Sequence, residues 1–216
     1  MLGLSVVNPT PEPASLVLAS SSPRRRELLG ALGLSFTIDP PHIDEREPGR
    51  FADQDAVRAW VEQLARHKAQ AVAVRHAPSA WVLGADTIVV LGNEVFGKPT
   101  SAEHAVEMLA RLQGRTHVVM TAVALRPGGH DGDGVTSAVV ETAVTFYPAT
   151  RAELAAYVAA GESMDKAGAY AAQGRGALII ERIDGCYFNV VGLPLARVAR
   201  MLHEVGFAVW SAGELP

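Results

Sequence analysis

The sequence has little that could cross-link the chain or bind a metal through sulfur. Its 216 residues include one cysteine, Cys186, which excludes an internal disulfide and any zinc site built on several thiolates. The formal net charge is −4, from 19 Lys and Arg against 23 Asp and Glu, so the chain lacks the basic excess of a nucleic-acid coat protein. We therefore expect no nucleic-acid partner.

Long apolar runs are missing as well. No stretch reaches the roughly 18 uncharged residues of a membrane helix. Residues 1–13 carry no Lys or Arg, unlike the basic start of a secretory signal. Together with the single cysteine, these absences predict a cytoplasmic protein without a membrane partner.

Two catalytic motifs are absent too. The sequence has no G-x-S-x-G turn, which argues against a nucleophilic serine hydrolase. It has no G-x-x-x-x-G-K-[ST] loop, which argues against a P-loop kinase or ATPase. The seven histidines show no paired metal-ligand spacing, so we interpret them as structural or surface residues.

What is present predicts an α/β fold. Hydrophobic residues make up 49% of the chain, enough for a large buried core. The mixture of crossovers and hairpins indicates a mixed sheet flanked by helices, in one domain over 15–210 between tails at 1–14 and 211–216. Apolar runs predict strands at 16–19, 81–91, 118–125, 137–146 and 177–183. Apolar stripes predict helices over 55–76 and 194–205, and capping signals predict further helices that start at Pro23 and at the capping boxes of Thr100 and Thr150.

The turn at residues 20–26 carries the strongest local signal for a binding site. Ser22 followed by Pro23 predicts a helix N-terminus, whose first amides are unpaired and partly positive. Three arginines, at 24–26, fall in that first turn, where the helix dipole disfavours cations. An anion such as phosphate would satisfy the amides and the guanidinium groups together. A solvated basic turn is the alternative interpretation.

Two charged residues fall on predicted buried faces. Lys68 continues the apolar stripe of the helix at 55–76, where a lysine either extends to solvent or meets a negative partner. Asp86 lies inside the strand at 81–91, where an ionised carboxylate is unfavourable unless it is paired, hydrogen-bonded or metal-bound. Thr87 points to the opposite face and could reach the same ligand only near a strand end or at a bend.

Further charges lie in predicted loops. Lys98 precedes a helix, and Glu45 stands in the acidic segment 43–47. Asp165, Lys166 and Gln173 stand in another loop that is punctuated by glycines. The arginine turn with Lys68 and Lys98 supplies cations, and Glu45 with Asp86 supplies carboxylates. These groups can bind a polyphosphate ester through a divalent metal ion and activate water. Ordinary surface charge is the alternative interpretation of the loop residues.

Five motifs then occur in one order along the chain. They are LASSSPRRRELL at 18–29, LGADT at 83–87, GKP at 97–99, DKAGAYAAQG at 165–174 and NVVGLP at 189–194. Through these motifs the chain resembles the Maf family over residues 16–206. The resemblance implies an elongated α/β fold of two lobes around a central cleft, similar to inosine triphosphatase-like house-cleaning enzymes. His67 stands where the family usually has Glu, and Ala171-Ala172 where it commonly has Gly-Ile.

The resemblance also implies an activity. Family members hydrolyse nucleoside triphosphates between the α- and β-phosphates, with a divalent metal ion, here Mg²⁺ or Mn²⁺. By motif, Asp86 matches the proposed proton acceptor for the attacking water. Glu45 matches a catalytic residue that is either a metal ligand alongside Asp86 or a second acid, while Lys68 and Lys98 match catalytic partners of the phosphates. Because family members are commonly dimers, the resemblance further implies a homodimer.

Three positions bear on the choice of substrate. Arg24, Thr87 and Gln173 match the residues that separate subfamilies: the dTTP/UTP type carries Arg, Thr and Gln there, and the 7-methyl-GTP type Trp, Gln and Glu. The sequence therefore predicts a dTTP and UTP pyrophosphatase, with modified pyrimidine triphosphates as further candidate substrates. A 7-methyl-GTP pyrophosphatase and a non-catalytic nucleotide-binding regulator of cell division are the alternatives. The remaining residues expected to bind substrate are Ser20, Ser22 and Arg25.

Overall fold

The computed structural model describes residues 14–43, 49–129 and 134–210. The predicted tails, apart from Ala14, lie outside these ranges. Glu45 and the centre of the loop between the strands predicted at 118–125 and 137–146 also lie outside the described residues.

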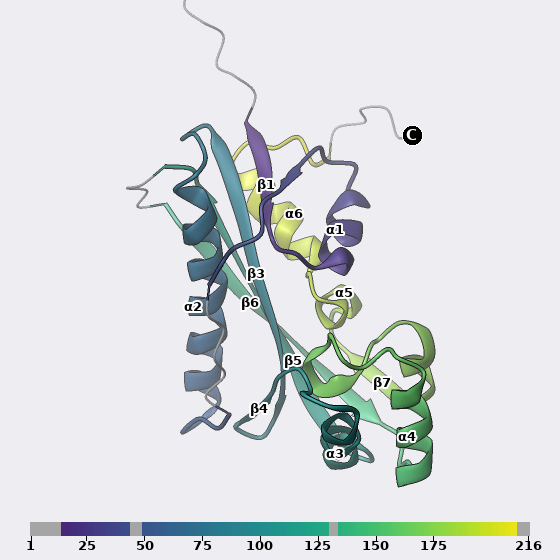
Figure 1. The fold of residues 1–216 in the computed structure, drawn as a ribbon. Helices are drawn as coiled ribbons and strands as arrows, with labels where there is room; N and C mark the ends of the chain where they lie inside the picture. The colour runs from purple at the N-terminus through teal and green to yellow at the C-terminus, as the bar shows by residue number, and fades with distance from the viewer. Residues whose placement is uncertain (1–13, 44–48, 130–133, 211–216) are drawn as a thin grey trace, which may run out of the picture.

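A mixed seven-stranded sheet, formed by the described residues, runs through an elongated molecule (Figure 1). The strands lie in the order β2–β1–β3–β5–β6–β7, and β4 pairs with β3. Strands β2, β1 and β3 are parallel, and the other pairs are antiparallel. The predicted mixed α/β fold is therefore confirmed. The bounds are β1 Ser15–Ala19, β2 Thr37–Ile38, β3 Ala80–Leu91, β4 Glu94–Phe96, β5 Thr116–Pro127, β6 Thr136–Phe146 and β7 Ile180–Asp184.

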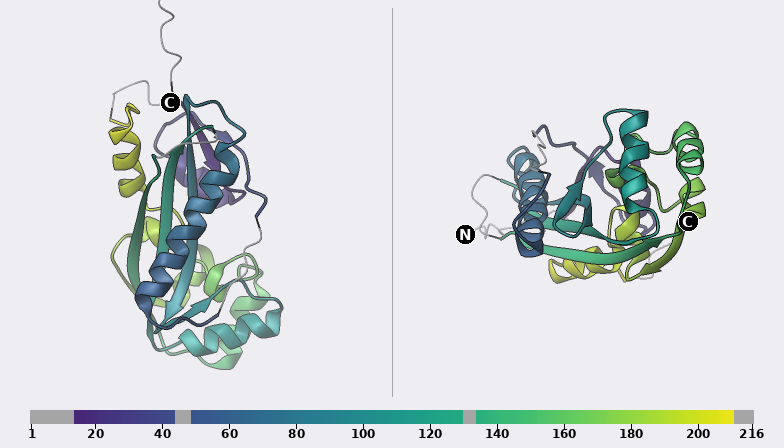
Figure 2. Two further views of the ribbon diagram at one scale, coloured as in Figure 1. Left: turned by 90° about the vertical axis from the view of Figure 1, so that its left-hand side faces the viewer. Right: turned by 90° about the horizontal axis from the view of Figure 1, so that it is seen from below.

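Helices cover the sheet at different places along its length. The long helix α2 lies lengthwise along β3 and β5 (Figures 1 and 2). Helices α1 and α6 lie near β1, and α3 and α4 lie at the opposite end of the molecule (Figure 1). The helices of the described residues are α1 Pro23–Gly30, α2 Gln54–Ala73, α3 Ala102–Leu112, α4 Arg151–Ala159, α5 Tyr187–Val191 and α6 Leu195–Glu204, with short 3₁₀ turns η1 Ala167–Ala169 and η2 Gly174–Leu178.

Alternating side chains of β3 enter three apolar clusters. Val82 and Val90 pack in the cluster that α2 covers. On the other face, Leu83 packs with residues of α1 and α6, whereas Val89 packs with residues of α3 and α4. Thr87 lies on this second face between Leu83 and Val89. On this face of β3, the polar residue Thr87 therefore separates the apolar cluster that contains Leu83 from the one that contains Val89.

Several element boundaries differ from the predictions. The predicted capping box at Thr150 is confirmed for α4. Helix α3, in contrast, begins one residue later than predicted, because the Ser101 hydroxyl and not that of Thr100 accepts the capping hydrogen bond. Strand β7 begins at 180 instead of 177, because residues 174–178 form the 3₁₀ turn η2. The short helix α5 was not predicted, since five residues are too few for an apolar stripe.

Gly84 allows α2 to lie directly on β3. A Cβ at Gly84 would stand 2.4 Å from the Ala65 carbonyl oxygen and 2.6 Å from the Ala69 nitrogen. We expect Gly84→Ala to lower the free energy of unfolding by about 3 kcal/mol, because the helix backbone would have to move away. Gly30→Ala, where a Cβ meets nothing within 4 Å, is the control and should be neutral or slightly stabilising. Urea unfolding measures both, and an unchanged midpoint for Gly84→Ala would contradict this packing.

Candidate active site

A cavity of about 360 Å³ opens at an unpaired stretch of the β3 edge. Strand β1 pairs with β3 as far as Gly84, and β4 pairs with it from Val89 onward. Within the described ranges, no strand pairs with residues 85–88 on this edge. The gap lies beyond the carboxyl end of the parallel strand β1, a place where α/β sheets commonly bind ligands.

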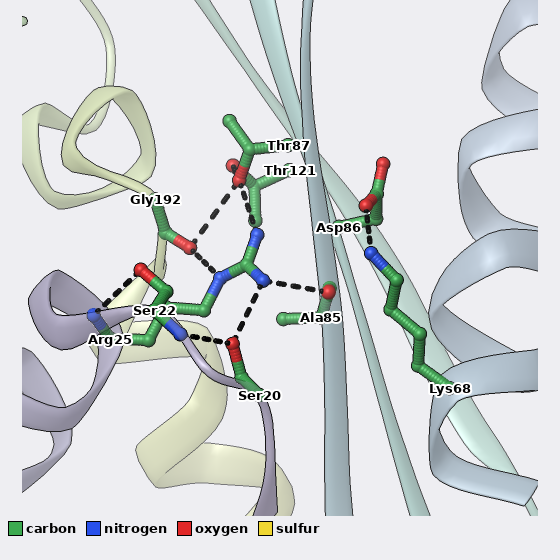
Figure 3. A network of polar contacts seen from close by, with 9 residues as sticks. All are labelled: Ser20, Ser22, Arg25, Lys68, Ala85, Asp86, Thr87, Thr121 and Gly192. Atoms are coloured by element: carbon green, nitrogen blue, oxygen red, sulfur yellow. Dashed lines mark hydrogen bonds and ion pairs between the residues drawn. The ribbon is translucent and has the colours of Figure 1, made fainter. Parts of the chain in front are cut away.

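Because this edge is open, the cavity reaches both faces of β3. Asp86 points toward α2 and Thr87 toward the opposite side (Figure 3), yet both line the cavity. The alternation of side chains predicted that Thr87 would need a strand end or a bend to share a ligand with Asp86. The structure brings them to one space differently, since β1 stops pairing at Gly84 and the cavity lies where no strand covers the edge of β3.

The turn before α1 forms one wall of the cavity. Ser22 is the N-cap of α1, and its Oγ accepts a hydrogen bond from the Arg25 amide at 3.5 Å. The Ser20 Oγ accepts one from the Ser22 amide at 3.2 Å. Both serines line the cavity, and their hydroxyls fix the shape of the turn; that they bind substrate stays a prediction.

Arg25 connects this turn to the centre of the sheet (Figure 3). Its Nη1 donates to the Ala85 carbonyl oxygen at 2.9 Å, which satisfies an acceptor on the unpaired edge. Its Nη2 donates to the Thr87 Oγ1 at 3.0 Å, and its Nε to the Gly192 carbonyl oxygen at 2.9 Å. The Thr87 Oγ1 also lies 2.9 Å from the Oγ1 of Thr121, its register partner on β5. Arg25 thus supplies hydrogen bonds to the polar groups around Thr87, between the apolar clusters that contain Leu83 and Val89.

The three consecutive arginines differ in their surroundings. Arg24 lines the cavity and pairs with Asp165 at 3.0 Å. Arg26 is exposed and does not line the cavity. The expectation that all three arginines face one anion is therefore wrong, because successive residues of an α-helix point about 100° apart.

Lys68 and Asp86 form a buried ion pair. The Lys68 Nζ lies 2.5 Å from the Asp86 Oδ1, and the side chains are 6% and 11% exposed. One Asp86 oxygen faces Lys68 and the other is turned away from it (Figure 3). Of the two interpretations of Lys68, the negative partner is thus confirmed. The sequence indicated both residues separately and did not indicate that they pair.

Two loops from the other end of the molecule complete the lining. Lys98 follows β4 and is exposed, and Gln173 precedes η2. Both line the cavity. The Gly168 amide donates to the Gly97 carbonyl oxygen at 3.0 Å, so the loops that carry Lys98 and Gln173 contact each other.

Two further charged residues belong to this lining, although the sequence indicated them only as loop residues with surface charge as the alternative and did not assign them to the site. Asp165 and Lys166 line the cavity and contact each other at 2.6 Å. Burial acts to raise the pKa of Asp165, but hydrogen bonds from Lys166 and Arg24 outweigh it and hold the pKa below its ordinary value. The signal was the adjacent opposite charges in a Gly- and Ala-rich segment. Taken alone, such residues are most often on the surface.

The described residues offer a limited donor set for a metal ion. No group of three or more His, Cys, Asp and Glu side chains gathers among them. Mg²⁺, however, is commonly held by one or two carboxylates together with substrate phosphates and water. Asp86, with one oxygen turned away from Lys68, fits that mode of binding. The other expected ligand, Glu45, lies outside the described residues.

A buried aromatic cluster supports the wall of the cavity. Tyr170 lines the cavity, and its hydroxyl lies 2.8 Å from the Nε2 of His117 on β5. The rings of His117, Tyr170 and Phe146 meet edge to face, with centroids 4.7–5.3 Å apart. Burial lowers the pKa of His117 to about 4 and raises that of Tyr170 well above its ordinary value. His117 is therefore neutral near pH 7.

His117 should make the protein less stable in mild acid. Its pKa is about 4 in the folded protein against an ordinary 6.5, so between these values the unfolded chain binds a proton that the folded protein does not. Stability should therefore fall as the pH drops from 6.5 toward 4, by about 3 kcal/mol at ~1.4 kcal/mol per unit. Urea unfolding across this range measures it. The variant His117→Gln has no titrating ring at this position, so its free energy of unfolding should fall less over the same pH range. An equal fall in the variant would show that His117 is not the group responsible.

The fold and the site together define a class of protein. The cavity at the open edge of a mixed sheet is lined by cations from four segments and by a buried carboxylate, a lining suited to a polyanionic ligand with several phosphates. The chain belongs to the Maf family, since the family model for Maf-like proteins matches residues 15–205.

Relatives of known name support the family assignment. The chain is 53% identical over 197 residues to a dTTP/UTP pyrophosphatase of Moorella thermoacetica, a match that covers 91% of this chain and 98% of the relative. It is 48% identical over 198 residues to a dTTP/UTP pyrophosphatase of Myxococcus xanthus, covering 91% and 96%. A dTTP/UTP pyrophosphatase of Shigella sonnei is 48% identical over 191 residues, covering 88% and 92%.

Among the helices of the described residues, none combines the length and the apolar character needed to cross a bilayer.

Proposed function

We propose that this chain hydrolyses dTTP and UTP to the nucleoside monophosphate and pyrophosphate. The observation that carries the proposal is the cavity at the open edge of β3, where Asp86 and several cations line one space. A nucleoside triphosphate matches this lining because its negative charges are spread along three phosphates. The names of relatives 48–53% identical to this chain support the choice of substrate.

The proposed mechanism uses the side chains in separate roles. Arg24, Lys98 and Lys166 bind phosphate oxygens and stabilise the charge that develops on them. Lys68 matches a phosphate partner by motif, but its Nζ is paired with Asp86, and we propose that it orients Asp86 instead. Asp86 accepts the proton of a water molecule whose oxygen forms a bond to the α-phosphorus. The bond from that phosphorus to the oxygen bridging to the β-phosphate breaks, and pyrophosphate leaves.

We propose that a divalent cation, Mg²⁺ or Mn²⁺, is held by Asp86 and the substrate phosphates, with Glu45 as the second candidate ligand. When bound, it would neutralise phosphate charge and favour attack at phosphorus. Asp86 supports this assignment because only one of its oxygens faces Lys68 (Figure 3).

The preference for pyrimidines is assigned to Arg24, Thr87 and Gln173. Arg24 and Gln173 line the cavity, at α1 and before η2. Thr87 acts through Arg25, because its hydroxyl accepts a hydrogen bond from that guanidinium group.

The deciding experiment is pyrophosphate release by the purified protein on dTTP, UTP, CTP, GTP, ATP and 7-methyl-GTP, with Mg²⁺ or Mn²⁺ and an EDTA control. Metal-dependent release that is highest with dTTP and UTP supports the proposal. A maximum on 7-methyl-GTP would keep the chemistry and refute the assigned specificity. Nucleotide binding without release by a folded protein would favour a non-catalytic regulator.

The proposal also covers the domain organisation, the oligomeric state, the location and the partners of the protein. We propose a single domain over 15–210 that acts as a homodimer in the cytoplasm, without a nucleic-acid or membrane partner. Light scattering of the purified protein tests the oligomeric state, and a salt-dependent mobility shift with RNA or DNA would refute the absence of a nucleic-acid partner.

A further inference from the structure

The loop over residues 165–173, called here the site loop, contributes three polar side chains to the cavity. Asp165, Lys166 and Gln173 all line it. Between them the site loop turns back into the protein, and Tyr170 is 5% exposed there. The contacts that hold Tyr170 in the protein therefore also determine the positions of the three polar side chains.

The backbone of the site loop needs such support. Gly168 and Ala169 have φ values of 69° and 60°, in the left-handed region that an alanine rarely adopts. A Cβ at Gly168 would stand 2.9 Å from the Val89 side chain, so the loop packs tightly on β3. A conformation of this kind persists only where neighbouring contacts enforce it.

His117 provides the contact from behind the loop. Its Nε2 lies 2.8 Å from the Tyr170 hydroxyl, and its Nδ1 has no hydrogen-bond partner among the described residues. A buried ring with an unsatisfied nitrogen is less favourable than an apolar side chain of similar size. Stability alone therefore does not explain a histidine at this position, whereas the hydrogen bond to Tyr170 does.

Other contacts show that this hydrogen bond lies at the centre of the loop's attachment. On one side of Tyr170, the Gly168 amide donates to the Gly97 carbonyl oxygen at 3.0 Å, next to Lys98. On the other side, the Ala171 amide donates to the Tyr157 hydroxyl at 3.1 Å. A shift of Tyr170 would disturb both.

We propose that His117 is a positioning residue for the substrate. Through Tyr170 it sets where Asp165, Lys166 and Gln173 stand, and thereby the affinity for the triphosphate and the preference for dTTP and UTP over CTP. This inference rests on the proposed function.

Two variants test the hydrogen bond directly. Tyr170→Phe removes only a hydroxyl, and His117→Leu removes the ring nitrogens. Each should raise the KM for dTTP about tenfold and reduce the preference for dTTP over CTP, with kcat within about threefold. The double variant should be no worse than either single variant, because both remove the same bond. His117→Gln, whose amide can bond to the Tyr170 hydroxyl, should restore much of the affinity.

Phe146→Leu is the matched control for packing. Phe146 contacts both His117 and Tyr170 but makes no part of their hydrogen bond. The variant should lower the melting temperature and leave the KM for dTTP and the preference for dTTP unchanged. A rise of KM in Phe146→Leu equal to that in Tyr170→Phe would overturn the proposal, since packing alone would then account for the effect.

Hydrogen exchange provides a measurement that does not depend on activity. In Tyr170→Phe the amides of Gly168 and Ala171 should exchange about tenfold faster, while amides of α2 stay as in the wild type. Unchanged exchange at these amides would overturn the proposal, as would an unchanged KM in an active enzyme. A wild type that releases no pyrophosphate from any triphosphate would instead refute the proposed function, and the exchange result would still decide whether His117 holds the loop.

Discussion

With Mg²⁺ at saturating concentration, Asp86→Asn should lower kcat for dTTP by about 10²–10⁴-fold while the KM stays within about threefold of the wild type. Asparagine has nearly the size of aspartate, and its oxygen can still face the Lys68 Nζ, which lies 2.5 Å from Asp86 in the native pair. The amide cannot accept a proton from water, so the loss should fall on the chemical step. Steady-state pyrophosphate release measures both constants.

Asp165→Asn is the matched control, since Asp165 is the other described aspartate that lines the cavity. It should change kcat much less, because Asp165 is paired with Arg24 and Lys166 and has no role in proton transfer. Near-normal turnover of Asp86→Asn would remove Asp86 from the role of base. Recovery of that variant at high Mg²⁺ concentration would assign Asp86 to metal binding alone.

Lys68→Met should destabilise the protein by about 3–5 kcal/mol, because it leaves the Asp86 carboxylate buried without its cation. The two side chains are 6% and 11% exposed, so water screens the remaining charge poorly. We also expect little pyrophosphate release, since Asp86 loses the group that orients it. Urea unfolding and a turnover assay measure the two effects.

A double variant separates the two roles of this pair. Lys68→Met with Asp86→Leu should recover much of the lost stability, because an apolar pair can replace a buried ion pair, while remaining inactive. The control is Arg58→Met, which breaks the half-exposed ion pair with Glu141 and should hardly move the unfolding midpoint. A Lys68→Met variant as stable as the wild type would contradict the description of Lys68 and Asp86 as a buried ion pair.

Much of the site could be predicted from the sequence because each signal was local. Ser22 and Pro23 marked the start of α1, and Asp86 was conspicuous as a charge within an apolar strand. What could not be predicted was how these residues meet. The ion pair of Asp86 with Lys68 joins positions 18 residues apart, and Arg25 bonds to Gly192 across 167 residues. Sequence periodicity carries no information on such distances.

The sequence by itself determined the type and order of the main elements and most of the chemically active side chains, because apolar periodicity and helix caps depend on neighbouring residues. Only the tertiary structure decided that β1 lies beside β3 and pairs with it no further than Gly84, before the pairing of β4 with β3 begins at Val89. This pairing leaves residues 85–88 without a strand neighbour at one edge, and Asp86 and Thr87, on opposite faces of one strand, line the same cavity there. Strand pairing depends on contacts between segments far apart in the chain, which is why the sequence alone did not reveal the shared site.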